Sequence, residues 1–530
     1  MRIVIRDLRL NALASDNDAE AAAKKQLNSV FGANGFRNVS VYRSSVDARH
    51  VNNITKVFSV CADIECNGIS DDVLKKLNAT VLENGALDVK YGNEKAEYRP
   101  LIVGFGPAGM FCGLVLAENG YRPIIIERGN DISERDRAVM LFRTKGILDT
   151  ESNVQFGAGG AGTFSDGKLV TRINDKNCRY VIESFHKFGA PDSILTNAKP
   201  HIGTDNLGRI VSAIKERITE CGGEVFFNTR FEGYKKIGGG LSVKTSKGDL
   251  SCSTLVLATG HSARDTYTNL AEAGLEMVSK AFSVGVRVEQ LQAEINRSVY
   301  GRYAKMLGNA EYNFSYRKGE RAVYTFCMCP GGHVVEAASE EETVVVNGMS
   351  NYKRDGENSN AALVVSVLPE DCGGALFDGM NFQRQLERKA FVMGGSDYGA
   401  PIQTVGDYLN GTSGSAPTRI KPSYMDGKRN RLCDLNGLFP GYINSFLKEG
   451  LCRFEKKIKG YAPADAIMTG VETRTSSPIR IVRNEMLLSP TLDRIYPCGE
   501  GAGYAGGITS ASVDGIRVAL KIMERYKPLV

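Results

Sequence analysis

Residues 101–128 constrain the fold of this chain more than any other stretch. An apolar run is followed by glycines in the spacing Gly-x-Gly-x-x-Gly, then by a segment of helical character and a second apolar run. Gly104 permits a tight turn, Gly106 lets the backbone approach a pyrophosphate, and Gly109 lets a helix pack closely against the strand. The stretch therefore predicts the strand, turn, helix and strand of a dinucleotide-binding unit.

An acidic residue at the end of the second apolar run supports this prediction. Glu127 lies eighteen residues after Gly109, near the spacing at which a carboxylate accepts hydrogen bonds from an adenosine ribose. A 2′-phosphate would meet Glu127 as a like charge, which argues against NADP at this site. Pro107, Ala108 and Arg128 belong to the same stretch, so we assign them to the cofactor site as well.

Chain length, charge and cysteine spacing limit the number of domains and the classes of protein to be considered. A chain of 530 residues is too long for one core, which predicts about three domains. The net charge is only +6, from 66 basic and 60 acidic residues, so nucleic-acid binding gains no support from it. Arg2, Arg6 and Asp7 interrupt the first apolar residues, which excludes a signal peptide, and no transmembrane run is found. The twelve cysteines include no CxxC pair, so we expect a cytoplasmic protein without a metal site.

The residues before the motif, 1–97, are expected to form a separate module. No aromatic signature of RNA binding lies on its strands, so packing or partner contact is the expected role. The periodicity predicts strands at 2–10, 36–46, 54–65 and 86–91 and helices at 18–31 and 70–80, which is the β-α-β-β-α-β order of a ferredoxin-like α+β fold.

A glycine-rich stretch at 153–169 needs its own interpretation. Gly162, Gly167 and Lys168 fit the spacing of a phosphate-binding P-loop, but Leu169 stands where a Ser or Thr would ligate magnesium. We therefore predict a loop whose backbone N–H groups contact the cofactor, and a flexible surface loop is the alternative. The candidate contacts in this loop are Gly160, Gly162, Thr163 and Lys168.

Three further stretches follow the glycine-rich loop: an apolar run at 253–260, a β-rich region at 276–470 and a glycine-rich segment at 494–526. The apolar run 253–260 predicts a buried strand that ends at Thr259 and Gly260, where the chain can turn beneath a nucleotide. Residues 276–470 alternate in a way that predicts an antiparallel sheet with helices near 380–394 and 441–459, and we interpret them as an inserted substrate or cap domain.

Residues 494–526 form the final segment of interest. They read as a short strand, the pair Gly499-Glu500, a glycine-rich turn and an amphipathic helix. A helix that starts near Gly507 would aim its free N–H groups and its positive end at a ligand above the turn.

Together, the front motif, the Ala-Thr-Gly turn and the final Gly-acid pair resemble FAD-binding oxidoreductases of the glutathione-reductase-like superfamily. The resemblance covers residues 98–275 and 471–530 and implies an α/β FAD-binding domain of the Rossmann type. In that superfamily the C-terminal pair is usually Gly-Asp, whose acid binds the ribityl chain, and here Gly499 and Glu500 stand in its place. The resemblance further implies an adenine contact through the backbone of Phe231 and a pyrimidine-edge contact at Gly507, Ile508 and Thr509.

At finer detail the chain is similar to an uncharacterised bacterial family of FAD-dependent dehydrogenases, of the NAD(FAD)-utilising type. The strings that carry this similarity are FGAGGAGTFSDGKL, ATGHSARDTY, YTFCMCPGG, GVETRTSSPIRI and CGEGAGYAGGI. The similarity implies FAD and a small-molecule substrate of unknown identity. No second Gly-x-Gly-x-x-Gly follows a strand, so either NAD(P)H binds transiently over the flavin as reductant or the substrate itself reduces FAD.

The candidate catalytic side chains are two cysteines and two histidines. Cys327 and Cys329 lie two apart in a predicted strand and hence on one face, His333 follows that strand, and His261 follows the Ala-Thr-Gly turn. We favour a strand buried on both sides for the cysteines, with a redox or substrate contact and a metal as alternatives, and structural hydrogen bonds for the histidines, with proton donation as the alternative. Arg264 and Arg474 are candidates for holding an anionic substrate or for buried salt bridges.

Two other functions remain open at this point. One is a flavin-dependent RNA-modifying enzyme whose N-terminal module presents RNA, which needs a basic face. The other is a non-catalytic flavin-binding sensor. No feature of the sequence specifies the oligomeric state.

Overall fold

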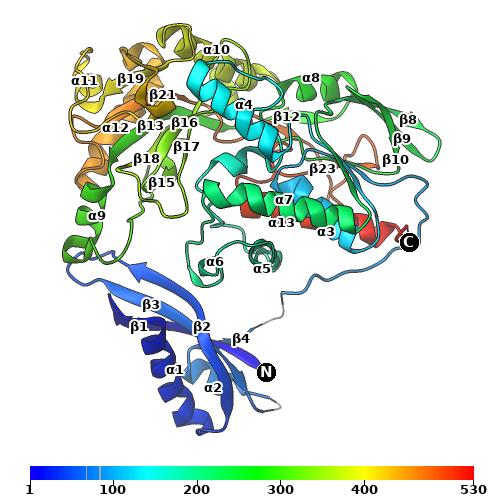
Figure 1. The fold of residues 1–530 in the computed structure, drawn as a ribbon, viewed down its shortest axis with the longest axis vertical. Coiled ribbons are helices and arrows are strands. Elements are labelled where there is room, and N and C mark those ends of the chain that lie inside the picture. Colours follow the sequence, from blue (N-terminus) through cyan, green and yellow to red (C-terminus); the bar gives the residue numbers. More distant parts are fainter. Residues whose placement is uncertain (67, 83–84, 530) are drawn as a thin grey trace.

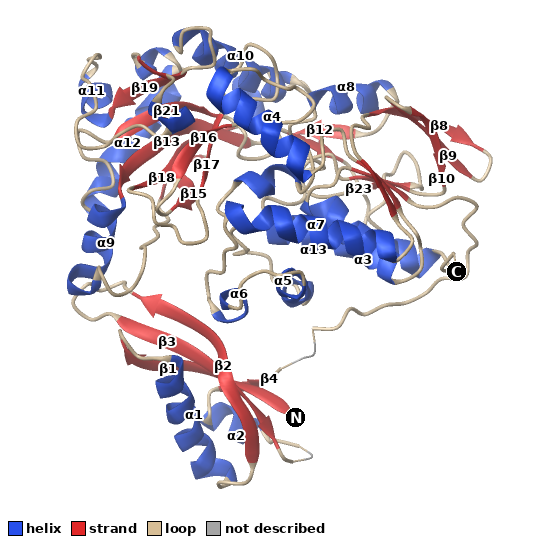
Figure 2. Ribbon diagram, in the orientation of Figure 1, coloured by secondary structure: helices blue, strands red, loops and turns tan. Residues whose placement is uncertain are grey.

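The computed structural model describes residues 1–66, 68–82 and 85–529, and it shows a mixed α/β protein with several sheets (Figures 1 and 2). At its centre is a five-stranded parallel sheet in the order β23-β11-β5-β6-β7. Each strand is short, and the three central ones are apolar, which is typical of strands covered on both faces. The strands are β5 (Leu101–Val103), β6 (Ile124–Ile126), β7 (Glu224–Phe226), β11 (Leu255–Leu257) and β23 (Ile495–Pro497).

Helices cover one face of this sheet and a small antiparallel sheet covers the other. On the helical face, the core contains α3 (Pro107–Glu118), α7 (Thr204–Glu220) and α13 (Ile508–Arg525), with α5 (Asn177–Lys187) beside α13. On the opposite face, β8 (Phe231–Ile237), β9 (Gly240–Thr245) and β10 (Gly248–Cys252) pack with α8 (Arg264–Glu272). Strand β10, which pairs with β9 in a hairpin, was not predicted from the sequence.

Helices α3 and α13 touch at backbone distance, although they lie 400 residues apart in the chain. A Cβ on Gly515 of α13 would collide with the Ala108 carbonyl oxygen of α3. A Cβ on Gly109 would collide in the same way with the Gly104 carbonyl oxygen, which explains the third glycine of the motif. The close approach of α3 and α13 therefore depends on glycine at position 515, and the packing of α3 against the turn after β5 depends on glycine at position 109.

A seven-stranded sheet forms most of the region between α8 and the final segment. Its order is β14-β15-β18-β13-β21-β19-β20, and all neighbours are antiparallel except β19 and β20. The helices predicted here begin and end within three residues of the observed α10 (Asp378–Met393) and α12 (Gly441–Lys457). The strands are β13 (Phe282–Leu291), β14 (Ser315–Lys318), β15 (Arg321–Cys329), β18 (Asn358–Val367), β19 (Ala400–Thr404), β20 (Asn430–Leu432) and β21 (Ile467–Glu472).

Two short pairs and several small helices complete this part. The strand pair β12 (Met277–Ser279) with β22 (Ile479–Ile481) lies where the chain enters and leaves the larger sheet, and β16 (His333–Glu336) pairs with β17 (Val346–Met349). The further helices are α4 (Ile132–Lys145), α6 (Ser193–Thr196), α9 (Gln292–Tyr300) and α11 (Val405–Asn410).

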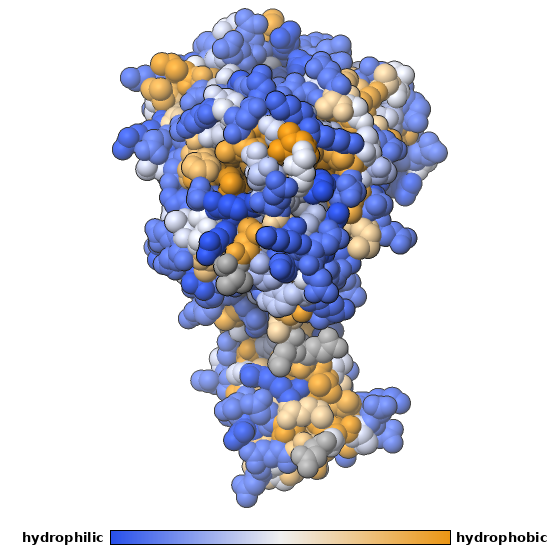
Figure 3. All heavy atoms as spheres, turned by 90° about the vertical axis from the view of Figure 1, so that its right-hand side faces the viewer, coloured by the Kyte–Doolittle hydropathy of each residue, from blue (hydrophilic) through white to orange (hydrophobic). Residues whose placement is uncertain are grey.

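The N-terminal residues form a four-stranded antiparallel sheet in the order β2-β3-β1-β4, backed by α1 (Asp16–Phe31) and α2 (Asp71–Lys76). Ser15 and Asp18 cap α1 reciprocally. The module stands at one end of the molecule, as a narrower lobe in Figure 3. It meets the rest at β2, where the Ala198 N–H donates to the Ser44 carbonyl over 2.8 Å. The strands are β1 (Arg2–Asn11), β2 (Phe36–Asp47), β3 (Thr55–Ile64) and β4 (Ala79–Val81).

Two predictions for this module were wrong. The fourth strand is β4 (Ala79–Val81), not residues 86–91, and α2 ends at Lys76 rather than near residue 80. The helix stops early because Asn78 takes a positive φ, and the chain turns there into β4. The stretch beyond runs to the far end of α13, where Gly92 N–H donates to the Met523 carbonyl over 2.7 Å. Within the described residues, no helix has the length and apolar character needed to cross a membrane.

The helix contact yields a first test. Gly515→Ala places a methyl group against the Ala108 carbonyl, so we expect the free energy of unfolding to fall by about 1–3 kcal/mol, and the midpoint of thermal unfolding to fall with it. Gly441→Ala at the start of α12 is the matched control, since a Cβ there meets no atom within 4 Å. Equal unfolding midpoints for the two variants would contradict the contact.

Candidate functional site

Four glycine-containing segments meet at the carboxyl edge of the parallel sheet. The turn after β5 touches the loop at 157–164, because a Cβ on Gly160 would lie 3.0 Å from the Gly106 Cα. A Cβ on Gly162 would lie 3.2 Å from the Ile508 side chain at the start of α13. Ligands of open α/β sheets bind at this edge. The structure thus brings together three stretches that lie far apart in the sequence.

The turn after β11 completes the group. Gly260 and Gly501 lie against each other, since a Cβ on Gly501 would collide with the Gly260 backbone. A Cβ on Gly499 would lie 2.7 Å from the Ala108 Cβ. Positions Gly260 and Gly507, by contrast, have no atom within 4 Å in the Cβ direction. These two glycines therefore border open space beside the four segments.

Glu127 is buried and holds two of these segments together. Its Oε2 accepts from the Phe105 N–H over 2.9 Å, and its Oε1 accepts from the N–H groups of Gly129 and Gly157 over 3.0 and 2.9 Å. A carboxylate has about four acceptor positions, so one remains for a further donor. Next to it, Arg128 forms ion pairs with Glu151 and Asp265 over 3.1 and 2.9 Å.

Arg135 of α4 is a residue that the sequence analysis missed. Its guanidinium is fully buried and donates to four backbone carbonyls. Burial lowers the pKa of Arg135 to about 10, and Glu127 opposes this shift. Nothing in the sequence singled it out, because it lies among the other charged residues of the stretch 132–145. The four acceptors are the carbonyl oxygens of Asn153, Val154, Ala158 and Gly160, so Arg135 fixes the path of the glycine loop.

Other predicted cofactor contacts are engaged within the protein. The Lys168 ammonium donates to the Met328 carbonyl, and the Thr163 hydroxyl donates to the Ala158 carbonyl over 3.2 Å. The Thr509 hydroxyl donates to the Leu169 carbonyl over 2.7 Å. The hydroxyl hydrogens of Thr163 and Thr509 are therefore engaged within the protein, and their oxygens can still accept a hydrogen bond.

Three more predicted positions lie at the ends of elements. Pro107 is the first residue of α3, and Thr259 follows β11 and is half-buried. Phe231 begins β8, with its side chain in the apolar core that also contains Val103 and Ile126.

A histidine and a glutamate approach each other beside these turns. The His261 Nε2 lies 3.6 Å from the Glu500 Oε1. Burial, with Arg474 and Arg264 nearby, lowers the pKa of His261 to about 3, so the ring is neutral. Burial raises the pKa of Glu500 to about 7, and Lys280 opposes this shift. Glu500 therefore exchanges its proton near neutral pH.

The cysteine pair departs from the predicted geometry. A β-bulge interrupts β15 between Phe326 and Cys329, and Cys327 has a φ of 44°. Simple strand alternation therefore does not set the geometry of this pair, although the two thiols lie close enough to interact. A hydrogen bond with Cys329 lowers the pKa of Cys327, aided by Arg287, and the same bond raises the pKa of Cys329. His333 begins β16, where burial and Arg143 lower its pKa.

The two arginines with alternative roles form a buried salt bridge. Both bind Glu387 of α10: Arg264 at 2.8 and 2.9 Å, and Arg474 at 3.0 and 3.2 Å. Across the described ranges 1–66, 68–82 and 85–529, no group of three or more metal-ligating side chains is found.

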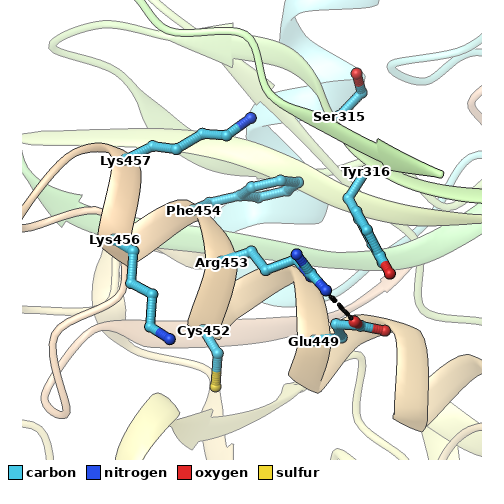
Figure 4. Close-up of a pocket in the computed structure, with 8 residues that line it drawn as sticks. All are labelled: Ser315, Tyr316, Glu449, Cys452, Arg453, Phe454, Lys456 and Lys457. Atoms are coloured by element: carbon cyan, nitrogen blue, oxygen red, sulfur yellow. Dashed lines mark hydrogen bonds and ion pairs between the residues drawn. The ribbon is translucent and has the colours of Figure 1, made fainter. Parts of the chain in front are cut away.

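A separate cavity of about 540 Å³ lies between β14 and α12 (Figure 4). The Arg453 guanidinium crosses it, bonded to Glu449 over 2.8 Å and stacked 3.8 Å from the ring centre of Tyr316. None of its lining residues is a predicted cofactor or catalytic residue: they are Ser315, Tyr316, Glu449, Cys452, Arg453, Phe454, Lys456 and Lys457.

The raised pKa of Glu500 has a consequence for stability. The folded protein keeps this proton up to pH of about 7, whereas the unfolded chain loses it near 4.5, so stability falls as pH rises through that window. Glu500→Gln removes the titration at equal size. We expect the wild type to lose on the order of 3 kcal/mol more than this variant between about pH 5 and pH 8, measured by urea unfolding.

The matched control is Glu485→Gln at an exposed position. It should follow the wild-type pH curve. Parallel curves for the wild type and Glu500→Gln would show that burial of Glu500 does not shift its pKa.

Among solved structures, CtdE in complex with FAD is similar at 10% identity with a TM-score of 0.33, over 81% of this chain and 87% of that chain. NikD, described as an unusual amino acid oxidase, is similar at 11% identity with a TM-score of 0.33, over 82% and 99% of the two chains.

Comparison of sequences identifies a matching domain family and a close relative over the whole chain. Residues 281–475 match the family described as FAD-dependent protein, C-terminal domain-like. An uncharacterized protein of Clostridium beijerinckii is 44% identical over 542 residues, which covers 99% of both chains. At this identity and coverage, the chain belongs to the same protein family as the Clostridium beijerinckii protein.

Proposed function

We propose that this chain is an FAD-dependent oxidoreductase that acts on a small-molecule substrate. One observation carries the proposal: the turns at 104–109, 258–261 and 499–507 and the loop at 157–164 meet at the carboxyl edge of one parallel sheet. This is where open α/β sheets bind nucleotides. The description of the family matched by residues 281–475 supports FAD as the nucleotide.

The groups at this edge suit the parts of FAD. Gly106 and Gly160 leave the backbone bare where a pyrophosphate would approach, and Glu127 keeps an acceptor for a ribose hydroxyl. Gly260 and Gly507 border open space of the kind that a flat ring system needs.

Bound FAD supplies hydride or electron transfer, while the chain binds, orients and excludes water. The start of α13 presents free N–H groups and the positive end of an 18-residue helix, which favours negative charge on a ligand. Glu500 holds a proton near neutral pH, 3.6 Å from a neutral imidazole. We propose that these two residues hold or move the proton that accompanies the redox step. A catalytic role for Cys327, Cys329 or His333 stays a prediction.

Each proposed domain corresponds to one or two continuous stretches of the chain. We propose that residues 98–275 and 471–530 form a glutathione-reductase-like FAD-binding domain, that 276–470 form the substrate or cap domain, and that 1–97 form a ferredoxin-like module. The strand orders of the five-, seven- and four-stranded sheets support this division. The twelve free cysteines support a cytoplasmic location.

The electron donor is tested on the purified protein by its visible flavin absorbance. Anaerobic titration with NADH and then NADPH should bleach the flavin band if a nicotinamide is the transient reductant. An unchanged band would assign reduction to the substrate itself. A protein that is purified without flavin and binds no added FAD would overturn the proposal.

A variant of the motif tests the site directly. Gly106 has an ordinary φ of −81°, and a Cβ there meets only the Gly160 Cα at 3.7 Å, so the fold should tolerate Gly106→Val. The valine methyls would fill the space needed by a pyrophosphate, and we expect FAD binding to weaken at least about tenfold. Flavin content and the unfolding midpoint are measured together.

The control here is Gly441→Val, which should keep its flavin. Full flavin content in Gly106→Val would place the cofactor elsewhere.

A further inference from the structure

A buried cluster with excess positive charge lies beside the turn that follows β11. It consists of Arg264, Glu387 and Arg474, whose side chains are 2%, 0% and 2% exposed. Two guanidinium groups share one carboxylate. A second carboxylate, Glu340, binds Arg264 over 2.8 Å, but it also pairs with Arg384 over 2.9 Å. The five side chains together keep one uncompensated positive charge.

Polar atoms in and around this cluster lack partners. In the part of the chain that the structure describes, the Arg474 Nη1, the Arg264 Nε, the His261 Nδ1 and the Ser339 Oγ are buried without a hydrogen bond. Buried polar groups are satisfied in the great majority of cases, so several unsatisfied atoms in one neighbourhood indicate a missing ligand. Three of the four atoms are able to donate a hydrogen bond whatever the tautomer of His261.

The pKa values of two side chains in this cluster are lowered. Burial lowers the pKa of Arg474 to about 10, and the adjacent Arg264 lowers it further. Both arginines, after burial, also lower the pKa of His261. These two shifts have the direction expected beside an uncompensated positive charge, whereas the pKa of Arg264 is raised because Glu387 and Glu340 outweigh its burial. An anion at this place would remove the imbalance.

The cluster lies between the turn after β11, at the proposed flavin edge, and the region of the seven-stranded sheet, where we place the substrate domain. Arg264 begins α8 directly after the Gly260 turn, Glu387 lies on α10, and Arg474 follows β21 (Figure 1). His261 connects it to Glu500 at 3.6 Å. The unsatisfied atoms therefore lie next to the edge where we place the flavin.

We propose that Arg474, together with His261, binds a carboxylate group of the substrate, so that the enzyme acts on a carboxylic acid. This inference rests on the proposed function, because it places the anion beside the flavin. A carboxylate accepts two hydrogen bonds side by side, which suits a guanidinium nitrogen and a neighbouring donor. Inorganic anions share part of this chemistry, and the test separates them from carboxylates.

The experiment uses purified holoprotein and follows thermal unfolding and flavin absorbance in sodium acetate, sodium benzoate, sodium chloride and sodium phosphate at equal ionic strength. We expect saturable stabilisation by acetate and benzoate and a perturbed flavin band, with neither effect in chloride or phosphate. Arg474→Lys keeps the charge but loses the planar fork, and it should weaken acetate binding at least about tenfold. Arg517→Lys, an exposed partner of Asp175 on α13, should bind acetate like the wild type.

Each outcome decides the matter. Equal effects of all four salts, or equal acetate binding in Arg474→Lys and the wild type, would overturn the carboxylate site. If Arg474→Lys does not fold, the comparison of salts on the wild type still decides. A protein that holds FAD but responds to no carboxylate would refute this inference alone, since the flavin itself would then satisfy the unpaired groups. A protein without FAD would refute the proposed function instead.

Discussion

The contact between α3 and α13 is the constraint on which the site depends. It joins the helix of the first glycine motif to the helix that follows the final Gly-acid pair, and glycine at position 515 allows the approach. Since α13 begins directly after the turn at 499–507, its position on α3 decides where that turn lies. Together with the pairing of β23 and β11, this contact brings the chain on either side of the seven-stranded sheet to one ligand edge.

Two buried charged side chains, Arg135 and Glu127, hold the glycine-rich loop at 153–169 in place. Among the described residues Arg135 forms no salt bridge, and it binds four carbonyls of the glycine-rich loop, while Glu127 accepts N–H groups from the loop and from the turn after β5. One buried cation and one buried anion thus organise opposite polarities of the same backbone. Hydrogen bonds to the backbone, rather than a direct ion pair, satisfy both charges and offset the cost of burying them.

Local patterns predicted those elements whose signals are local. The strand, turn and helix of 101–118 and the start of α13 follow from apolar runs and glycine spacing, and so do the main strands of the larger sheet. The strand expected at 86–91 does not form, and this stretch leads instead to Gly92, whose N–H donates to the Met523 carbonyl at the end of α13, over 400 residues away. The bulge at Cys327 and the burial of Arg135 depend on tertiary contacts that leave no trace in periodicity. Lys168 matched a phosphate-binding spacing, yet it bonds to the end of β15.

The position of β23 at the edge of the parallel sheet has a consequence for synthesis. Its neighbour β11 is made some 240 residues earlier, and the whole seven-stranded sheet lies between them in chain order. During translation, β11 therefore presents an unpaired edge until β23 emerges, although the seven-stranded sheet already has all its strands. Unpaired strand edges are exposed to wrong pairing. The nascent chain thus passes through a stage in which one sheet is finished and the other remains open to a neighbouring strand or a chaperone.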